Sequence, residues 1–161
     1  MQKHIISALV VNKPGVLSHA ASLFSARGFN IDSLAVGETD QPEFSRMTIV
    51  VAGDESILEQ VRKQLGKLID VVKVQDFSGT SYVERDLALI RVHSPVSRRG
   101  EILELADIFR ARVVDVGRSD VMLELSGTED KIEAMVDLLR PYGIREMVRT
   151  GRIALQRSNR A

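Results

Sequence analysis

The segment Asn-Lys-Pro-Gly-Val-Leu at residues 12–17 marks the point where the first predicted strand turns into the first predicted helix. Residues 4–11 are almost continuously apolar and rich in β-branched side chains, which predicts a strand. Pro14 suits a first helical position because its ring fixes φ and its nitrogen carries no hydrogen. Gly15 would let a ligand approach the backbone closely. The amides of residues 15–17 are then expected at the positive end of a helix, which attracts a carboxylate.

A second segment, Gly-Phe-Asn-Ile-Asp-Ser at residues 28–33, follows the same predicted helix. Apolar residues recur at helical spacing over residues 15–27, and Gly28 is a typical helix stop. Asn12 and Asn30 can each supply an uncharged oxygen, which suits a ligand ammonium. Together the two segments predict a site for a small zwitterion. An ordinary turn with a capped helix is the alternative interpretation of residues 12–17 taken alone.

The order of the predicted elements is strand, helix, strand, strand, helix, strand, and it occurs twice. Helix starts are expected after Asp54, Ser97 and Thr128, whose side chains can cap a helix. This predicts an α+β fold of two ferredoxin-like βαββαβ units, each an antiparallel sheet with two helices on one face. The expected domains are 1–78 and 83–161, joined by a linker at 79–82. The expected strands are 4–11, 30–38, 46–52, 71–77, 87–93, 112–116, 121–125 and 144–149.

The composition is that of a globular protein, with 44% hydrophobic residues among 161. Lysine plus arginine equals aspartate plus glutamate, at 22 each. This balance gives no electrostatic reason to expect nucleic acid or a membrane surface as a partner. The absence of cysteine excludes disulfides, thiolate metal sites and thiol nucleophiles. No signal peptide and no apolar stretch of about 20 residues is visible, so a cytoplasmic location is expected.

Catalysis by this chain is not expected. It has three histidines and none of the common metal, phosphate or nucleophile motifs. An RNA-recognition module shares the βαββαβ order, but its base-stacking aromatic residues have no counterpart in strands 4–11 and 46–52. Arg149, Arg152, Arg157 and Arg160 make the C-terminal region basic, which is typical of a solvated end and could also suit an acidic partner.

The first half of the chain resembles ACT domains. The residues that carry the resemblance are Asn12, Gly15, Val16 and Leu17, followed by the segment from Leu23 to Leu34. More narrowly, the chain is similar to the small regulatory subunits of acetolactate synthase. Three further segments agree in order with that family, namely residues 45–49, 64–71 and 83–87.

The resemblance implies a non-catalytic chain that binds and activates the large subunit of acetolactate synthase and confers feedback inhibition by valine or another branched-chain amino acid. Thiamine diphosphate, FAD and Mg²⁺ would belong to the large subunit, with no cofactor on this chain. The resemblance also implies a homodimer through the ACT domains with the effector at the interface. Asn12, Gly15, Val16 and Leu17 would form one side of the valine site, and Asn30 and Ile31 of the paired chain the other. The alternative is an ACT-type amino-acid sensor that regulates a different client protein.

Strand 4–11 gives an independent reason to expect a further packing partner. Its two alternating faces are both mostly apolar, with Ile5 and Leu9 on one and Ile6 and Val10 on the other. The helices can cover only one face, so the other face needs cover. A second copy paired at the sheet edge would help to supply it, and so would the second half of the same chain.

Overall fold

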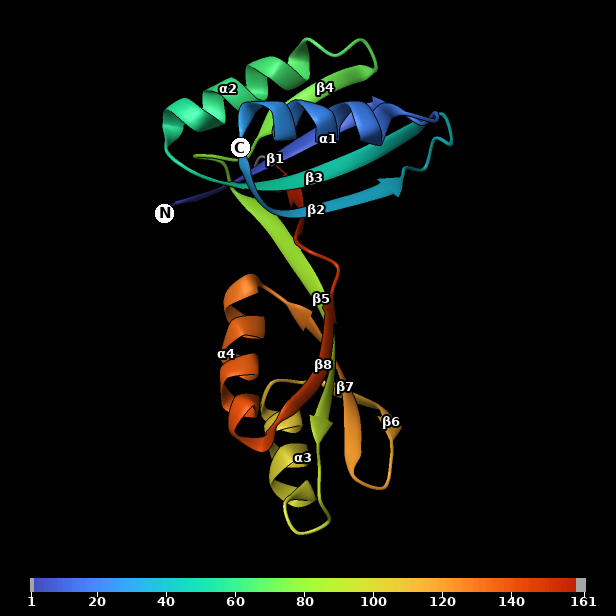
Figure 1. The fold of residues 1–161 in the computed structure, drawn as a ribbon, viewed down its shortest axis with the longest axis vertical. Helices are drawn as coiled ribbons and strands as arrows, with labels where there is room; N and C mark the ends of the chain where they lie inside the picture. Colours follow the sequence, from blue (N-terminus) through green and yellow to red (C-terminus); the bar gives the residue numbers. More distant parts are fainter. Residues whose placement is uncertain (1, 159–161) are drawn as a thin grey trace. The chain divides into compact units, whose positions relative to one another are not determined.

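The computed structural model describes residues 2–158, which divide into two compact units. Unit 1 comprises Met1–Val83 together with Arg152–Ala161, and unit 2 comprises Glu84–Gly151. Each unit has an antiparallel sheet with two helices packed on one face, as Figure 1 shows. The predicted fold class, two βαββαβ units of the α+β class, is confirmed.

Unit 1 contains a four-stranded sheet in the order β2-β3-β1-β4. The central strands β1 and β3 carry the buried apolar residues, whereas β2 and β4 form the edges. The two helices connect β1 to β2 and β3 to β4. The elements of this sheet are β1 (Lys3–Val11), α1 (Val16–Arg27), β2 (Asn30–Glu38), β3 (Phe44–Ala52), α2 (Glu55–Gly66) and β4 (Val71–Asp76).

The main core of unit 1 lies between the sheet and its two helices. It joins alternate residues of β1 and β3 to the apolar stripes of α1 and α2, as period-two and period-3.6 patterns require. Asp54 begins α2, and its carboxylate accepts hydrogen bonds from the Ser56 hydroxyl at 2.7 Å and the Ile57 amide at 3.0 Å. These two hydrogen bonds lower the pKa of Asp54 below its ordinary value.

The opposite face of the same sheet carries a second, smaller apolar cluster. Ile5 and Val50 pack there against Phe77 and against Ala154 from the C-terminal strand β9 (Ile153–Gln156). Tyr82 closes the cluster, with its ring 5.3 Å from that of Phe77. The second apolar face of β1, for which a second copy or the second half of the chain was expected as cover, is therefore partly covered by residues of this chain, among them Ala154.

This packing bears on the place of the C-terminal region. Residues 152–158, which were expected in the second domain, pack in the structure with unit 1, where Ala154 is buried beside Ile5 and Val50. The basic C-terminal region is also not simply solvated, since the Arg152 side chain is buried. Arg160 lies outside the described residues.

Unit 2 repeats the plan, with the strand order β6-β7-β5-β8. Its core joins alternate residues of β5 and β7 to the buried stripes of α3 and α4. β9 pairs with β5, whose first two residues, Tyr82 and Val83, belong to unit 1. The elements of unit 2 are β5 (Tyr82–His93), α3 (Arg99–Ile108), β6 (Arg112–Val116), β7 (Asp120–Gly127), α4 (Glu129–Leu139), the 3-10 turn η1 (Arg140–Tyr142) and β8 (Ile144–Arg149).

The two helices of unit 2 begin differently. Thr128 caps α4 as predicted, because its hydroxyl accepts a hydrogen bond from the Lys131 amide. Ser97 was expected to cap the other helix, and this prediction is wrong. The N-cap of α3 is Arg98, which makes no side-chain capping bond, and the loop before it is held instead by the side chain of Arg99.

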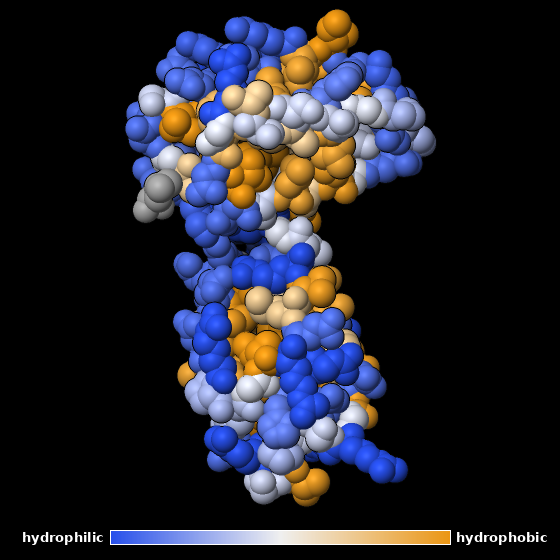
Figure 2. All heavy atoms as spheres, viewed as in Figure 1, coloured by the Kyte–Doolittle hydropathy of each residue, from blue (hydrophilic) through white to orange (hydrophobic). Residues whose placement is uncertain are grey.

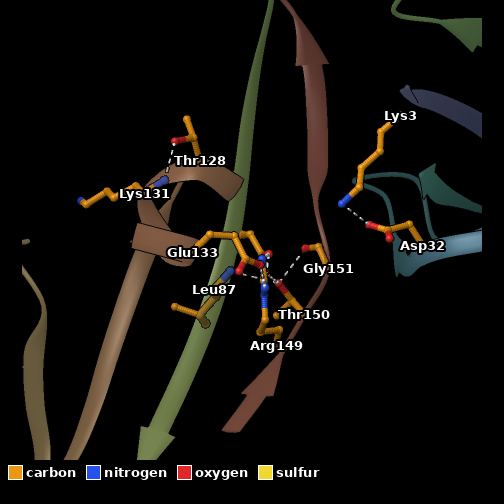
Figure 3. Close-up of polar contacts among 10 residues, drawn as sticks. Lys3, Asp32, Leu87, Thr128, Lys131, Glu133, Arg149, Thr150 and Gly151 are labelled. Carbon is orange, nitrogen blue, oxygen red and sulfur yellow. Dashed lines mark hydrogen bonds and ion pairs between the residues drawn. The ribbon is translucent and has the colours of Figure 1, made fainter. Parts of the chain in front are cut away.

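A buried carboxylate ties the beginning of β5 to the end of β8. Figure 3 labels Arg149 and Glu133 at this point. Asp86 is 2% exposed and accepts two hydrogen bonds from Arg149, at 2.7 and 3.0 Å. The other arm of Arg149 donates to Glu133 on α4. Burial alone would lower the pKa of Arg149, but the hydrogen bonds that its guanidinium donates to Glu133 and Asp86 outweigh this effect and raise that pKa.

Candidate functional site

The turn between β1 and α1 has the backbone geometry that an anion site requires. Gly15 is the N-cap of α1 and adopts a left-handed conformation, with φ 90° and ψ −14°. Only glycine takes this conformation without strain. Because Gly15 has no side chain, the first amides of α1 receive no side-chain cap. A Cβ added at Gly15 would meet no atom within 4 Å, so the space at the side-chain position of this turn residue is open.

The Asn12 side chain lies beside this turn in a defined orientation. Its amide nitrogen donates a hydrogen bond to the Pro42 carbonyl at 2.9 Å and approaches Glu38 Oε2 at 3.4 Å. Since the nitrogen is engaged by an acceptor, the Asn12 oxygen remains available to a donor. The Glu38 carboxylate adds negative charge close to that oxygen. An ammonium group is therefore well matched to the Asn12 side of the turn.

The two predicted nonpolar contributors of the turn differ in exposure. Val16 is 6% exposed, and its side chain belongs to the main core of unit 1. Only the backbone amide of Val16 is thus suited to a ligand on the outer side of the helix. Leu17 is 47% exposed and can offer an apolar contact there.

Asn30 and Ile31 begin β2 at the opposite end of the sheet. Asn30 is paired with Ala52, and Ala52 is paired with Lys3 at the start of β1. Asn12 follows the last residue of β1, which has nine residues, so the two asparagines are separated by about 30 Å of strand at 3.3 Å per residue. One chain does not bring the two predicted halves of the site together.

β2 forms one edge of the unit 1 sheet and has little to deter pairing. It has nine residues, and its only charged side chains are Asp32 and Glu38. Asp32 pairs with Lys3 at 3.0 Å, as drawn in Figure 3. Val36 is 45% exposed at this edge. Figure 2 shows apolar atoms gathered where Figure 1 draws β2 and β3. A long edge strand of this kind is a ready template for another strand.

A cleft that the sequence did not indicate lies on the inner side of α1. Its volume is about 310 Å³. Val10 and Met47 line it from the sheet, and Val16 and Ala20 line it from the helix. Lys13 and Asp70 form an ion pair of 2.8 Å, and Asp70 contributes to the lining. The cleft lies between α1 and the connection from α2 to β4, which are far apart in the sequence, so no local pattern along the chain reveals it.

Residues 2–158 contain neither a metal site nor a membrane-spanning helix. No group of three or more His, Asp or Glu side chains is placed to hold a metal ion. Within the same range, no helix combines the length and the apolar character needed to cross a membrane.

Comparison with known protein families accounts for both units. A family described as "AHAS small subunit-like ACT domain" matches residues 6–73. A second family, described as "Small subunit of acetolactate synthase", matches residues 85–158. The two matches meet close to the boundary between units 1 and 2.

Curated relatives and a solved structure extend the similarity to nearly the whole chain. A probable acetolactate synthase small subunit of Archaeoglobus fulgidus is 56% identical, over 98% of this chain and 99% of that protein. The acetolactate synthase small subunit of Aquifex aeolicus is 51% identical, over 98% and 82% of the two chains. The crystal structure of the small subunit from Thermotoga maritima is 42% identical and covers 99% of both chains, with a TM-score of 0.90.

Proposed function

The chain belongs to the small subunits of acetolactate synthase, which are non-catalytic regulatory subunits, and from this premise we propose that it senses valine at a site shared by two copies. Binding of valine would inhibit the large catalytic subunit, which the chain activates when the site is empty. The observation that carries the proposal is the uncapped glycine turn at the N-terminus of α1 beside the oriented side chain of Asn12.

The valine carboxylate would accept hydrogen bonds from the amides of Gly15, Val16 and Leu17. These groups lie at the positive end of α1, where an anion is stabilised by about 0.3–1 kcal/mol in addition to the hydrogen bonds. The ammonium would donate to the oxygen of Asn12, with the Glu38 carboxylate nearby. Both charged groups of an amino acid therefore have complementary partners within a few residues of one turn.

A two-fold axis through β2 would complete the site with residues of a second copy. If β2 pairs antiparallel with itself about Leu34, Asn30 of one copy comes opposite Glu38 of the other. Glu38 lies 3.4 Å from the Asn12 side chain, so the turn of one chain and the start of β2 in the other would meet. The unpaired edge of β2 and the distance between Asn12 and Asn30 in one chain both support this arrangement.

The apolar part of the site would set the preference among amino acids. The isopropyl group would contact Leu17 of one chain and Ile31 of the other. Burying such a group is worth about 2 kcal/mol, and alanine, which lacks two methyl groups, should bind about tenfold more weakly. Leucine and isoleucine should be discriminated only modestly, because a hydrophobic pocket rejects one extra methylene poorly.

Transmission to the large subunit requires only a modest coupling. A ligand that bridges two chains favours one relative orientation of these chains, and the large subunit would bind one orientation better. A coupling free energy of about 1–3 kcal/mol is typical of such regulation. The thiamine diphosphate, FAD and Mg²⁺ that the family implies would remain on the large subunit, where the pyruvate condensation takes place.

Calorimetric titration of the chain with valine tests the effector, and two variants test the site. Gly15→Asp puts a negative charge over the amides, and Asn30→His fills the opposite side of the site. Each should abolish inhibition of the reconstituted enzyme by valine while activation of the large subunit persists. Gly79→Asp is the matched control, since Gly79 is exposed with φ 72° and open space around its Cβ position. Inhibition by valine that survives Gly15→Asp unchanged would refute the site.

The shared nature of the site has its own test. Val36→Lys places a charge in the middle of the exposed β2 edge, so it should convert dimers to monomers in analytical ultracentrifugation. Binding of valine should be lost together with the dimer, although Val36 is not assigned to the carboxylate or ammonium side of the site. A monomeric variant that binds valine with wild-type affinity would show that one chain suffices.

A further inference from the structure

Three loops of unit 2 meet at the end of the sheet where β5 ends. His93 pairs with Asp120 at the start of β7, and its amide donates to the Gly143 carbonyl at 2.8 Å. The Ser94 amide donates to the Ser119 carbonyl, also at 2.8 Å. The loops 94–98, 117–119 and 140–143, with the adjoining Arg91, Arg99 and Arg145, are here called the arginine tip.

The side chain of Arg99 makes the arginine tip rigid. Its guanidinium donates to the Ser94 hydroxyl at 3.2 Å and to the Ser94 carbonyl at 3.0 Å. It also donates to the carbonyls of Gly117 and Arg118, at 2.9 and 3.1 Å. Four hydrogen bonds from one side chain thus tie two of the loops together. A surface ordered in this way loses little conformational entropy when a partner binds.

An apolar side chain projects from this rigid frame. Val96 is 81% exposed, although it lies on a loop that is fixed on both sides. Figure 2 shows an apolar group at the end of unit 2, where Figure 1 draws the loop between β5 and α3, with hydrophilic atoms around it. Nearby, the Arg98 guanidinium lies over the Tyr142 ring, 4.3 Å from its centroid. Arginine and tyrosine around an apolar residue form a composition typical of protein interfaces.

The charge of the arginine tip is not balanced by its own carboxylates. Arg91 and Arg145 both contact Asp120, at 3.8 and 3.2 Å, and Arg91 also lies 3.7 Å from Glu146 on β8, so two carboxylates serve these two cations. Arg99 is bound to neutral groups alone. Within residues 2–158, the exposed guanidinium of Arg118 has no hydrogen-bond or ion-pair partner. The remaining cations, Arg98 and Arg140, pair with Glu101 and Asp137 at the rim.

We propose that the arginine tip docks onto an acidic protein surface of the large catalytic subunit, with Val96 inserted at its centre and Arg118 paired with a carboxylate of the partner. The chain as a whole carries no net charge and the tip includes Asp120 between its arginines, which disfavours a nucleic-acid backbone. The proposal rests on the membership of this chain in a family of small subunits, but it does not depend on the valine site in unit 1.

Binding of the purified large subunit to the full-length chain tests the arginine tip. Val96→Asp and Arg118→Glu should each raise the Kd at least about tenfold, because the first would bury an unpaired carboxylate at the centre of the interface and the second would replace an ion pair by a repulsion. Val148→Asp and Arg112→Glu are the matched controls. Val148 is 60% exposed on β8, and Arg112 is exposed at the start of β6, away from the three loops. Neither control should change the Kd more than twofold.

The dependence on salt gives a second readout that does not require a variant. Raising NaCl from 50 to 500 mM should weaken binding of the wild-type chain at least about tenfold, and Arg118→Glu should flatten this dependence. A Kd that Val96→Asp and Arg118→Glu leave unchanged overturns the proposal, as does tight binding that is insensitive to salt. If the two tip variants lose the binding of the wild-type chain to anionic lipid vesicles but keep its affinity for the large subunit, the tip is assigned to a membrane and the proposal is overturned as well.

The test separates this surface from the proposed function. If the wild-type chain binds the large subunit and valine inhibits the complex, but the tip variants behave as wild type, only the docking surface falls. If the wild-type chain does not bind the large subunit at all, the regulatory function and the docking surface fall together. The tip variants should still bind valine as the wild-type chain does, since both substitutions lie in unit 2.

Discussion

Replacing the buried carboxylate of Asp86 should destabilise unit 2 by a large and specific amount. Asp86 is 2% exposed and accepts hydrogen bonds from Arg149 Nη2 at 2.7 Å, Arg149 Nε at 3.0 Å and Thr150 Oγ1 at 3.3 Å. Figure 3 shows the contacts of Arg149 and Thr150 at this point, close to the Leu87 amide that donates to Thr150. Asp86→Ala would leave a partly buried guanidinium with one carboxylate fewer.

The size of the destabilisation depends on the contacts that Arg149 keeps after the substitution. Removing one partner of a fully buried ion pair costs about 3–5 kcal/mol. Arg149 keeps Glu133, and 23% of its side chain is exposed, so water can reach it after the substitution. We therefore expect a loss of about 2–3 kcal/mol in the free energy of unfolding of unit 2. For a domain of this size, that loss corresponds to a fall of about 10–20 °C in its Tm.

The two tyrosines of the chain provide a separate reporter for each unit. The sequence has no tryptophan, Tyr82 belongs to unit 1 and Tyr142 belongs to unit 2. In a Tyr82→Phe background, tyrosine fluorescence during urea unfolding follows unit 2 alone. Asp115→Ala is the control, because Asp115 is exposed on β6 of the same unit. If the free energy of unfolding of unit 2 in Asp86→Ala lies within about 0.5 kcal/mol of that in this control, the reasoning is refuted.

A double-mutant cycle decides whether the loss comes from the pair itself. Arg149→Met removes the guanidinium, and the combined variant replaces both partners by apolar side chains. If the cost of Asp86→Ala is mainly an uncompensated cation, the combined variant should be less destabilised than the sum of the single variants, by about 1–3 kcal/mol. Additive losses would mean that Asp86 acts through Thr150 and the backbone instead.

Three further predictions concern helix ends. Gly28→Ala should lower the free energy of unfolding of unit 1 by about 1 kcal/mol, because Gly28 ends α1 with φ 65°. Gly66→Ala in α2 should raise it by about 0.5–1 kcal/mol. Tyr82 fluorescence during urea unfolding, in a Tyr142→Phe background, measures both changes. Thr128→Ala should cost unit 2 about 1 kcal/mol and Thr128→Ser much less, since the hydroxyl caps α4. The pKa of Asp54 is lowered in the folded chain, so the stabilisation by its carboxylate is present above about pH 4 and is lost as the pH falls through the lowered pKa. Asp54→Asn should remove this part of the dependence of the urea midpoint on pH.

Local signals explain which parts of the fold could be predicted. β6 and β8 have the predicted bounds, and Thr128 and Asp54 cap the helices that follow them. Each of these features depends on neighbours within a few residues. β9 was missed because four residues are too short for a pattern and because its buried residue, Ala154, packs on strands that lie far away in the sequence.

The candidate site divides in the same way. The conformation of Gly15 and the free amides after it depend on the turn alone, so the sequence could indicate them. The separation of Asn12 from Asn30 depends on the register of three strands, which sequence spacing does not reveal. Ser97 failed as a cap for a related reason. The loop is held by Arg99, whose guanidinium reaches the Gly117 carbonyl from the neighbouring loop.

The two halves of the repeat use the same topological position for opposite chemistry. In unit 1 the first strand leads into α1 through an uncapped glycine turn, which presents hydrogen-bond donors to a small anion. In unit 2 the equivalent connection leads into α3 through a longer loop, which Arg99 ties to the loop between β6 and β7 and which displays Val96. A small ligand fits the first arrangement and a protein surface fits the second. If the two proposals hold, divergence of the repeat gives one chain two separable tasks. Substitutions at Gly15 should then alter inhibition without changing affinity for the large subunit, and substitutions at Val96 should do the reverse.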